Sequence, residues 1–343
     1  MTNDSNRIVS VIMPCYNDGA YIEEAISSVE RQTYSDIELV IINDGSDDKK
    51  TLLILQNLRS RGITVIESNK KGPAAARNLG IKNANGKYIL PLDSDDVIDS
   101  TYIEKAVEII ESDESIGGVY CLAEYIGKRK GVWTLPAFSL EEMLLDNVVF
   151  ITTLFRKGDW EVAGGFDESL IYGMEDYDFW LSIMETGKTF YTIPEILFYY
   201  RIKRKSRTSM FQSDEEKIIM TYDKIYQNHK DFLLEHIDVY VMGLRKIIIS
   251  LVNKNHKYGN IYRLYHAIVR IYSIVKRFLR KMCSVVHAIV KRFLFFIIEV
   301  FKTLYRIIMK IFRLPKRCFR FAKRVIRYVF KGIKRKTIKA KGK

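Results

Sequence analysis

Several features that would point to other protein classes are scarce or absent in this chain of 343 residues. Its four cysteines are dispersed and lack the paired spacing of a zinc site, which favours a reducing compartment such as the cytoplasm. The polar segment 1–7 lacks the apolar core of a signal peptide. The longest uncharged apolar run, 293–298, is far shorter than the ~20 residues of a membrane span. We therefore expect neither a zinc domain nor a transmembrane helix.

Acidic residues are almost absent from the C-terminal quarter. From Arg263 onward the chain holds 25 Lys or Arg but a single acid, Glu299, so residues 263–343 carry a formal charge of +24. Because the whole chain carries +14, residues 1–262 carry −10. An acidic domain followed by a strongly basic tail suggests a partner with an anionic surface.

The basic tail is also patterned. At 100° per residue, all Lys and Arg of 270–313 except Lys276 fall on one helical face, and many of the apolar side chains fall on another. Such a helix is typical of a segment that lies on an anionic bilayer, where each Lys or Arg adds up to about 1 kcal/mol. We predict a helical packing region over 214–260 and a basic amphipathic tail over 261–343, which binds a membrane surface through residues 263–343. A protein partner, an oligomer contact or docking on the chain itself is the alternative, and the broad apolar face disfavours nucleic acid.

Ahead of the tail, short apolar runs alternate with helical patterns. Strands are predicted over 8–13, 37–42, 63–67 and 88–92, and helices over 21–33, 49–60, 74–83 and 177–186. This alternation indicates an α/β fold with a mostly parallel, doubly wound sheet, whose first strand should end at Pro14. Ligands of such sheets collect at the carboxyl ends of the strands. Tyr16, Asp44 and the tetrad 93–96 follow three of the predicted strands, so we expect the site there.

The tetrad Asp93-Ser94-Asp95-Asp96 puts three carboxylates into four positions directly after an apolar run. Carboxylates this close repel one another, and a hard divalent cation, Mg²⁺ or Mn²⁺, is the natural counterion for oxygen ligands. Such a metal predicts an anionic ligand, most simply a diphosphate. The alternative interpretation is a solvated turn or a helix cap.

Six motifs that follow one another between residues 7 and 210 resemble those of family 2 glycosyltransferases with the GT-A fold. They are Val11-Ile12-Met13-Pro14-Cys15-Tyr16-Asn17, Val40–Ser46, Gly72 with Ala76-Arg77-Asn78, Leu92–Asp96, Ala163–Glu168 and Glu175–Leu181. The resemblance implies a catalytic domain over 1–213, with a nucleotide-sugar half up to about residue 120 and an acceptor half over 121–213. It also implies a sugar nucleotide donor, most often a UDP sugar, a divalent metal, and inversion at the anomeric carbon.

On the donor side, the resemblance assigns roles to residues at the strand ends. Pro14 and Tyr16 are expected to line the base pocket, with the Tyr16 ring against the base. Asp44 is expected to read the base or the ribose, since a carboxylate accepts hydrogen bonds from both. Arg77 is expected near the nucleotide, where its guanidinium suits base or phosphate oxygens. From the sequence alone, Asp44 could also be a turn residue and Arg77 a surface arginine.

The resemblance assigns the metal to the acidic tetrad, with one departure from the family pattern. Asp95 is expected to hold the ion, and Asp93 to contact the ribose or to help order the metal site. Many relatives carry a histidine after the last strand that completes the metal shell, and Lys203 stands in its place. We predict that Lys203, Arg204 or Arg207 binds the diphosphate directly, and that the metal has fewer protein ligands. A solvated basic loop is the alternative.

Inverting transfer needs a carboxylate that takes the proton of the acceptor hydroxyl. By resemblance, Asp176 is the predicted base, with Glu175 beside it. The alternative is that both acids cap the helix that follows, whose first turn favours negative charge. Phe179 and Trp180 are expected in the core, and His229, which stands alone in the sequence, is expected to be a satisfied or solvated histidine without a metal role.

The predicted function is the metal-dependent, inverting transfer of a sugar from a nucleotide diphosphate donor to a lipid-linked or cell-envelope glycan. The enzyme is expected in the cytoplasm, peripherally bound to the inner face of the cell membrane. A nucleotide-sugar-binding scaffold without catalysis, which recruits partners through its helical tail, is the alternative. A nucleotidyltransferase is disfavoured, because it would need a glycine-rich basic loop after the first strand and residues 15–18 are not one.

Overall fold

The computed structural model describes residues 7–69, 71–203, 207, 211 and 213–254, with five further residues in the C-terminal region. The chain divides into two compact units, 1–251 and 252–343. The predicted basic tail over 261–343 lies almost wholly outside the described residues, so its helix, its two faces and its partners stay predictions.

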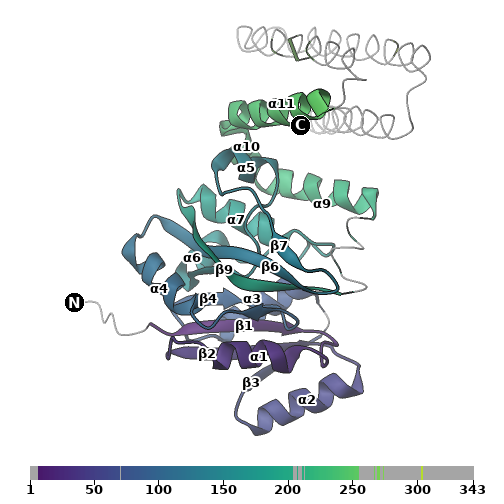
Figure 1. Ribbon diagram of the computed structural model, residues 1–343. Coiled ribbons are helices and arrows are strands. Elements are labelled where there is room, and N and C mark those ends of the chain that lie inside the picture. Colours follow the sequence, from purple (N-terminus) through teal and green to yellow (C-terminus); the bar gives the residue numbers. More distant parts are fainter. Residues whose placement is uncertain are drawn as a thin grey trace, which may run out of the picture. The chain divides into compact units, whose positions relative to one another are not determined.

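The first half of the sheet is parallel. Its elements are β1 (Val9–Cys15), α1 (Ile22–Glu30), β2 (Ile37–Asp44), α2 (Lys49–Ser60), β3 (Thr64–Ser68), α3 (Pro73–Asn83) and β4 (Tyr88–Pro91). β1 pairs in parallel with β2 and β4, and β2 with β3. Each strand and helix predicted for this stretch is present, with bounds that shift by at most three residues. Because the strands are parallel, their carboxyl ends meet at one edge of the sheet (Figure 1).

The prediction that Pro14 ends the first strand is wrong, because β1 continues to Cys15. Leu92 N–H donates to the carbonyl of Ile12 at 3.0 Å, so the backbone groups of Ile12 face β4. Because the direction of these groups alternates along a strand, those of Pro14, two residues later, face the same side. β4 itself ends at Pro91, opposite Ile12. An N–H at position 14 would therefore have no partner in β4, and a proline is tolerated there.

The second half of the sheet is mixed. Its elements are β5 (Val97–Ile98), α4 (Tyr102–Ser112), β6 (Ile116–Gly127), β7 (Gly131–Trp133), α5 (Leu140–Leu145), β8 (Leu154–Arg156), α6 (Lys157–Ala163), α7 (Glu175–Glu185) and β9 (Thr189–Ile202). β8 pairs antiparallel with β4 and β6, while β6 and β9 run parallel. In the described part of the chain the strands form one nine-stranded sheet of order β3-β2-β1-β4-β8-β6-β9-β5, with β7 on β6 (Figure 1). The α/β fold class is confirmed.

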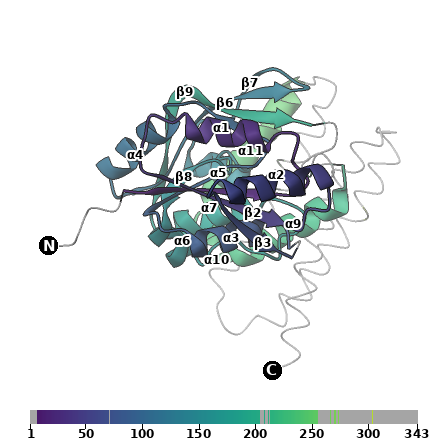
Figure 2. The same ribbon diagram turned by 90° about the horizontal axis from the view of Figure 1, so that it is seen from below.

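Helices cover both faces of the sheet. Figure 2 shows α1 and α4 on one side of it and α3 and α6 on the other. The strands between them are apolar on both faces, and Val11, Ile12 and Ile41 are fully buried, each contributing about 1.5–3 kcal/mol. Phe179 and Trp180 on α7 are fully buried as well, so they belong to the core, as predicted.

Helices α9 (Glu215–Asn228), α10 (Lys230–Glu235) and α11 (Ile237–Lys254) follow the sheet and confirm the predicted helical stretch after residue 214. His229, between α9 and α10, fastens them to α7: its Nε2 lies 3.1 Å from Asp178 and its Nδ1 2.9 Å from Glu185. Burial lowers the pKa of His229, but these two hydrogen bonds outweigh it and raise the pKa above its usual value. No helix among the described residues is long and apolar enough to cross a membrane.

Candidate active site

A short strand pairing brings the acidic tetrad next to the end of the last strand. β5 follows the tetrad directly and pairs antiparallel with β9, so residues 93–96 lie beside residues 200–203. Arg201 N–H donates to Asp96 Oδ1 at 2.7 Å, and Arg201 Nε donates to the carbonyl of Asp95 at 2.6 Å. Burial and the neighbouring carboxylates raise the pKa of Asp96 well above its usual value. Asp96 thus anchors the end of β9.

Asp95 and Lys203 form an ion pair. Lys203 Nζ lies 2.7 Å from Asp95 Oδ2 and 2.8 Å from Asp18 Oδ1, so one ammonium bridges two carboxylates. Ser94 Oγ donates to the other oxygen of Asp18 at 3.0 Å. Burial raises the pKa of Asp95 to about 6, against the opposing effect of Lys203. No role was predicted for Asp18, which reaches the tetrad from the loop after β1.

The expected metal site does not fit this arrangement as it stands. Among the residues that the structure describes, no three His, Cys, Asp or Glu side chains gather as metal ligands would. Asp93 and Asp95 each have a cationic partner, Arg77 at 2.6 Å and Lys203 at 2.7 Å. A divalent ion on Asp95 would lie about 4 Å from that ammonium, a repulsion of roughly 8 kcal/mol at an effective dielectric constant of about 20. Asp95 can hold a metal only once Lys203 has left it.

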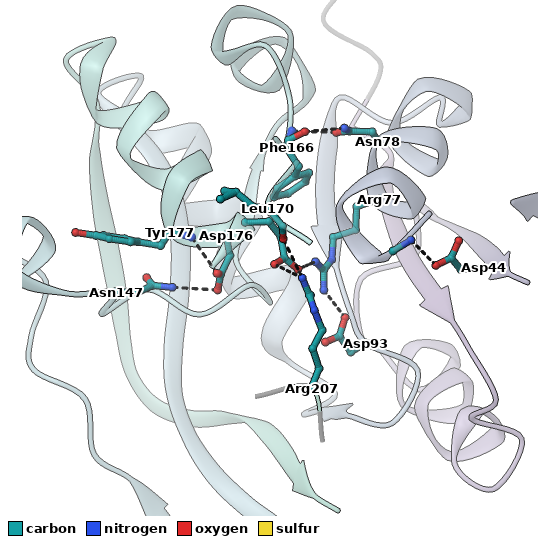
Figure 3. A network of polar contacts seen from close by, with 12 residues as sticks. Asp44, Arg77, Asn78, Asp93, Asn147, Phe166, Leu170, Asp176, Tyr177 and Arg207 are labelled. Carbon is teal, nitrogen blue, oxygen red and sulfur yellow. Dashed lines mark hydrogen bonds and ion pairs between the residues drawn. The ribbon is translucent and has the colours of Figure 1, made fainter. Parts of the chain in front are cut away.

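Arg77, on α3, links the tetrad to the start of α7 (Figure 3). It is buried, with Nη2 2.6 Å from Asp93 Oδ1 and Nη1 2.8 Å from Glu175 Oε1. Arg207 Nη1 and Nη2 donate to the two oxygens of Glu175 at 2.8 and 3.0 Å. Arg77 and Arg207 are therefore held by protein carboxylates. Arg204, which was predicted with Lys203 and Arg207 as a possible diphosphate contact, lies outside the described residues.

Glu175 and Asp176 differ in their electrostatic surroundings. Burial alone would raise the pKa of Glu175, but Arg207 and Arg77 outweigh it and hold the pKa at about 2. Burial and the charge of Glu175 raise the pKa of Asp176 to about 6. Near neutral pH, Asp176 is thus the stronger base of the pair, while Glu175 is a permanently ionised anchor for two arginines.

Asn147, in the loop after α5, orients Asp176 (Figure 3). Its Nδ2 donates to Asp176 Oδ2 at 3.0 Å, while Tyr177 N–H donates to Oδ1 at 2.9 Å. The amide oxygen of Asn147 accepts from Val149 N–H at 3.1 Å, which turns the amide nitrogen toward Asp176. No pattern in the sequence singles out this asparagine.

The start of α7 is set by two backbone positions in the left-handed region. Gly173 has a φ of 138° and Met174, the N-cap residue, a φ of 66°. The helix therefore begins at Glu175, two residues before its predicted start, and places Glu175 and Asp176 in the first turn, where the helix dipole favours negative charge. Met174 makes no side-chain cap hydrogen bond, and Asp176 Oδ1 accepts from the first-turn N–H of Tyr177, so the alternative that these acids serve the helix start stays open.

Asp44, the last residue of β2, holds the loop before α3 (Figure 3). Its Oδ1 accepts from Ser68 Oγ and from Lys71 N–H, and its Oδ2 from Gly72 N–H, each at 2.9 Å. A carboxylate offers about four acceptor positions, so these contacts leave roughly one for a ligand. Any contact of Asp44 with a base or ribose would have to use that position.

Tyr16 and Asn17 follow β1. Tyr16 is 40% exposed and so accessible to a ligand ring, whereas Pro14 is half-buried within the strand. Asn17, with a φ of 58°, accepts from the N–H groups of Asp47 and Asp48 at 3.0 Å and ties the end of β1 to the loop before α2. This clamp of the first two strand ends was not predicted.

Asn78 fixes the glycine loop that precedes α7 (Figure 3). Its Nδ2 donates to the carbonyl of Phe166 at 2.9 Å, and its Oδ1 accepts from Phe166 N–H at 3.0 Å and Trp160 Nε1 at 3.2 Å. A Cβ on Gly165 would lie 3.0 Å from Asn78 Oδ1, and the φ of 80° there also favours glycine. Adjacent residues of α3 thus support both the acids of α7 and the loop before it.

The chain is similar in sequence to known proteins. The family model for glycosyl transferase family 2 matches residues 10–176. An uncharacterized glycosyltransferase of Rickettsia typhi is 30% identical over 232 residues, which span 62% of this chain and 70% of that protein. The chain belongs to glycosyl transferase family 2. This family 2 glycosyltransferase is also 32% identical over 228 residues to an uncharacterized glycosyltransferase of Rickettsia prowazekii, with 62% of this chain and 67% of that protein covered.

Other likenesses concern a larger protein or the fold alone. The chondroitin synthase of Escherichia coli is 30% identical to this glycosyltransferase over 216 residues, which are 61% of this chain but only 31% of the synthase. S. aureus TarS in complex with UDP-GlcNAc superposes with a TM-score of 0.50 at 19% identity, covering 69% of this chain and 79% of that one. The mannosyltransferase PcManGT of Pyrobaculum calidifontis, in complex with GDP-Man and Mn²⁺, gives 0.50 at 15% identity, with 76% and 83% covered. These two structures show the shared fold.

Proposed function

We propose that this family 2 glycosyltransferase transfers a sugar with inversion from a nucleotide diphosphate donor, and that Asp176 is the catalytic base. The observation that carries the proposal is the contrast between two adjacent carboxylates. Arg207 and Arg77 keep Glu175 ionised, with a pKa of about 2, whereas the pKa of Asp176 is about 6. A general base works best when its pKa lies near the working pH.

In the proposed reaction, an oxygen of Asp176 accepts the proton of the acceptor hydroxyl as the hydroxyl oxygen bonds to the anomeric carbon. The bond between that carbon and the diphosphate oxygen breaks, and the nucleoside diphosphate leaves with the electron pair. Asn147 and the Tyr177 N–H orient the base. Glu175 does not touch the reacting atoms in this scheme and serves as a positioning residue.

We propose that the donor lies along the carboxyl ends of β1, β2 and β4, with UDP as its nucleotide. Pro14 and Tyr16 would line the base pocket, and the remaining acceptor position of Asp44 would take a base N–H or a ribose hydroxyl. Asp93, whose side chain is 32% exposed, is available to the ribose, and Lys203 to the diphosphate.

Mg²⁺ or Mn²⁺ stays a prediction from the family resemblance, with Asp95 and Asp93 as its ligands. A bound metal would add positive charge at the departing diphosphate. No step proposed above depends on it.

The proposed acceptor is a lipid-linked or cell-envelope glycan, and the proposed place of action is the cytoplasmic face of the membrane. The support is compositional, since residues 263–343 carry a formal charge of +24 that suits an anionic lipid surface. A protein partner for the same tail, and with it a scaffold that binds nucleotide sugars without turnover, is the second candidate.

Replacing the proposed base, Asp176, distinguishes a transferase from a scaffold that binds nucleotide sugars without turnover. With a panel of UDP and GDP sugars and isolated membrane glycolipid as acceptor, we expect Asp176→Asn to lower nucleoside diphosphate release by about 10²- to 10⁴-fold. Donor binding, followed by thermal shift, should persist. The matched control is Asp231→Asn in the first turn of α10, which should leave the rate unchanged. A wild-type chain that binds a nucleotide sugar but releases no diphosphate above background would support the scaffold instead.

A further inference from the structure

Lys203 pairs with Asp95, the residue to which the sequence analysis assigned the metal. It follows β9 directly, and its Nζ lies between Asp95 Oδ2 at 2.7 Å and Asp18 Oδ1 at 2.8 Å. The two carboxylates come from different strand ends, Asp18 from the loop after β1 and Asp95 from the tetrad after β4. A single cation that joins oxygens of two such loops is the arrangement expected of a divalent ion in this position. Here the side chain of the protein supplies it.

The ammonium is fixed in charge and still open to a ligand. Lys203 Nζ lies within 2.8 Å of two carboxylate oxygens, Asp95 Oδ2 and Asp18 Oδ1, and two such neighbours favour the charged ammonium form. Its side chain is 26% exposed, and two carboxylates engage two of its three N–H donors. The third N–H donor of Lys203 is therefore left for a phosphate oxygen.

The arginines around Lys203 already bind other groups of the protein. Arg77 is buried between Asp93 and Glu175, and Arg207 engages both oxygens of Glu175. Arg201 is held by the backbone of Asp95 and by the carboxylate of Glu24, 2.7 Å away. Two of these four side chains pair their charged group with a carboxylate of the tetrad, Arg77 and Lys203. The Arg77 side chain is only 4% exposed, whereas that of Lys203 is 26% exposed.

We infer that Lys203 is the counter-cation of the donor diphosphate, and that this chain binds nucleoside diphosphates without a divalent metal. The inference rests on the proposed function, because it concerns the same donor. It assigns Asp95 and Asp18 a positioning role: they hold the ammonium at the strand ends until the diphosphate oxygens take over part of its hydrogen bonding. The inference also changes the effect expected when Asp95 is neutralised. If Asp95 were a metal ligand, its loss would weaken the donor complex. If it only holds Lys203, the loss of a negative charge beside the diphosphate would not weaken that complex.

The test measures UDP binding by calorimetry with the full chain, once in EDTA and once in Mn²⁺, with GDP as a second probe. For the wild type we expect dissociation constants that agree within about 3-fold between the two conditions. Lys203→Met should weaken binding at least about 10-fold in EDTA, and Lys203→Arg, which keeps the charge, should retain it. Lys203→His should bind weakly in EDTA and recover in Mn²⁺, because an imidazole can coordinate the metal that an ammonium repels. Asp95→Asn should bind UDP in EDTA as well as the wild type or better.

The matched control is Lys105→Met. Lys105 is also a half-buried lysine in an ion pair, 2.6 Å from Glu195, with a side-chain exposure of 34%, and its loss should leave UDP binding unchanged. Thermal unfolding of each variant identifies one that has simply lost its fold. Wild-type binding that needs Mn²⁺, or binding that Lys203→Met leaves intact, would overturn the inference while leaving sugar transfer in place. A wild type that binds neither UDP nor GDP in either condition would overturn the proposed donor class, and the inference with it.

Discussion

The hydrogen bond from Asn147 to Asp176 leads to a quantitative prediction about the pH dependence of catalysis. Activity that needs ionised Asp176 rises with pH through the pKa of that carboxyl, which is about 6. Asn147 favours the ionised form, because its Nδ2 donates to Oδ2 at 3.0 Å. Removing this donor in Asn147→Ala must therefore raise the pKa and move the acidic limb of the profile upward.

The magnitude follows from the strength of a hydrogen bond to a charged group, about 1.5–3 kcal/mol. Water can replace part of it, because Asp176 is only partly buried, which leaves a shift of about one pKa unit at 1.36 kcal/mol per unit. The limb should move from about 6 to about 7, so that near pH 6 the variant keeps roughly a fifth of the wild-type kcat/KM, while the two rates converge above about pH 8. Asn147→Asp, which adds a negative charge beside the base, should move the limb further.

The measurement is kcat/KM against pH for wild type and variants with the same donor and acceptor. Asn83→Ala is the control, since the Asn83 side chain donates to the Leu79 carbonyl within its own helix, α3, and its loss should leave the limb in place. A variant whose rate falls by the same factor at every pH, with the limb still near 6, would refute the reasoning: Asn147 would then act on geometry alone, or Asp176 would not be the group that titrates.

Three further predictions concern stability and location. Arg77→Met should lower the free energy of unfolding, measured by urea denaturation, by about 3–5 kcal/mol, because two carboxylates lose their buried partner. The control Arg61→Met breaks an exposed pair with Glu30 and should cost less than about 1 kcal/mol. Similar losses in the two variants would contradict the role of Arg77. His229→Gln should lower the thermal midpoint more at about pH 6 than at about pH 9. The pKa of His229 is higher in the folded state than in the unfolded state, so its contribution to stability is full below the unfolded-state pKa and is lost as pH rises through the folded-state pKa. A difference in midpoint that stays the same at both pH values would argue against this role of His229. In a vesicle flotation assay, the full chain should float with anionic vesicles but not with neutral ones. Equal recovery with both kinds of vesicle would contradict the proposal of electrostatic membrane binding.

The parallel half of the fold could be predicted because each strand is a compact apolar run closed by loop residues. Both faces of these strands are covered by helices, so little polar alternation interrupts the pattern, as in Val9–Cys15. Pro14 was a misleading signal. A proline is disfavoured in a central strand where its missing N–H breaks a ladder bond, but the pairing of β1 with β4 ends at Ile12, so Pro14 lies beyond it.

The candidate site could be predicted as a set of residues but not as a set of contacts. Lys203 and Asp95 were both identified, yet their pairing depends on the two-residue strand β5 and its antiparallel register with β9, for which two residues give no sequence pattern. Asn147 is a lone asparagine in a loop, 29 residues from Asp176. His229 likewise finds its partners 44 and 51 residues away. Such contacts belong to the tertiary structure and leave no periodic trace in the sequence.

The shared guanidinium of Arg77 has a consequence for how the two substrates affect each other's binding. It divides its hydrogen bonds between Asp93, on the side proposed for the donor, and Glu175, next to the proposed base. A ligand that draws Asp93 away changes the hold of Arg77 on Glu175, and the reverse holds for a ligand that disturbs the start of α7. Linked equilibria are reciprocal, so whatever factor donor occupancy applies to acceptor affinity, acceptor occupancy applies to donor affinity. One buried arginine would then make the affinity for each substrate depend on the presence of the other.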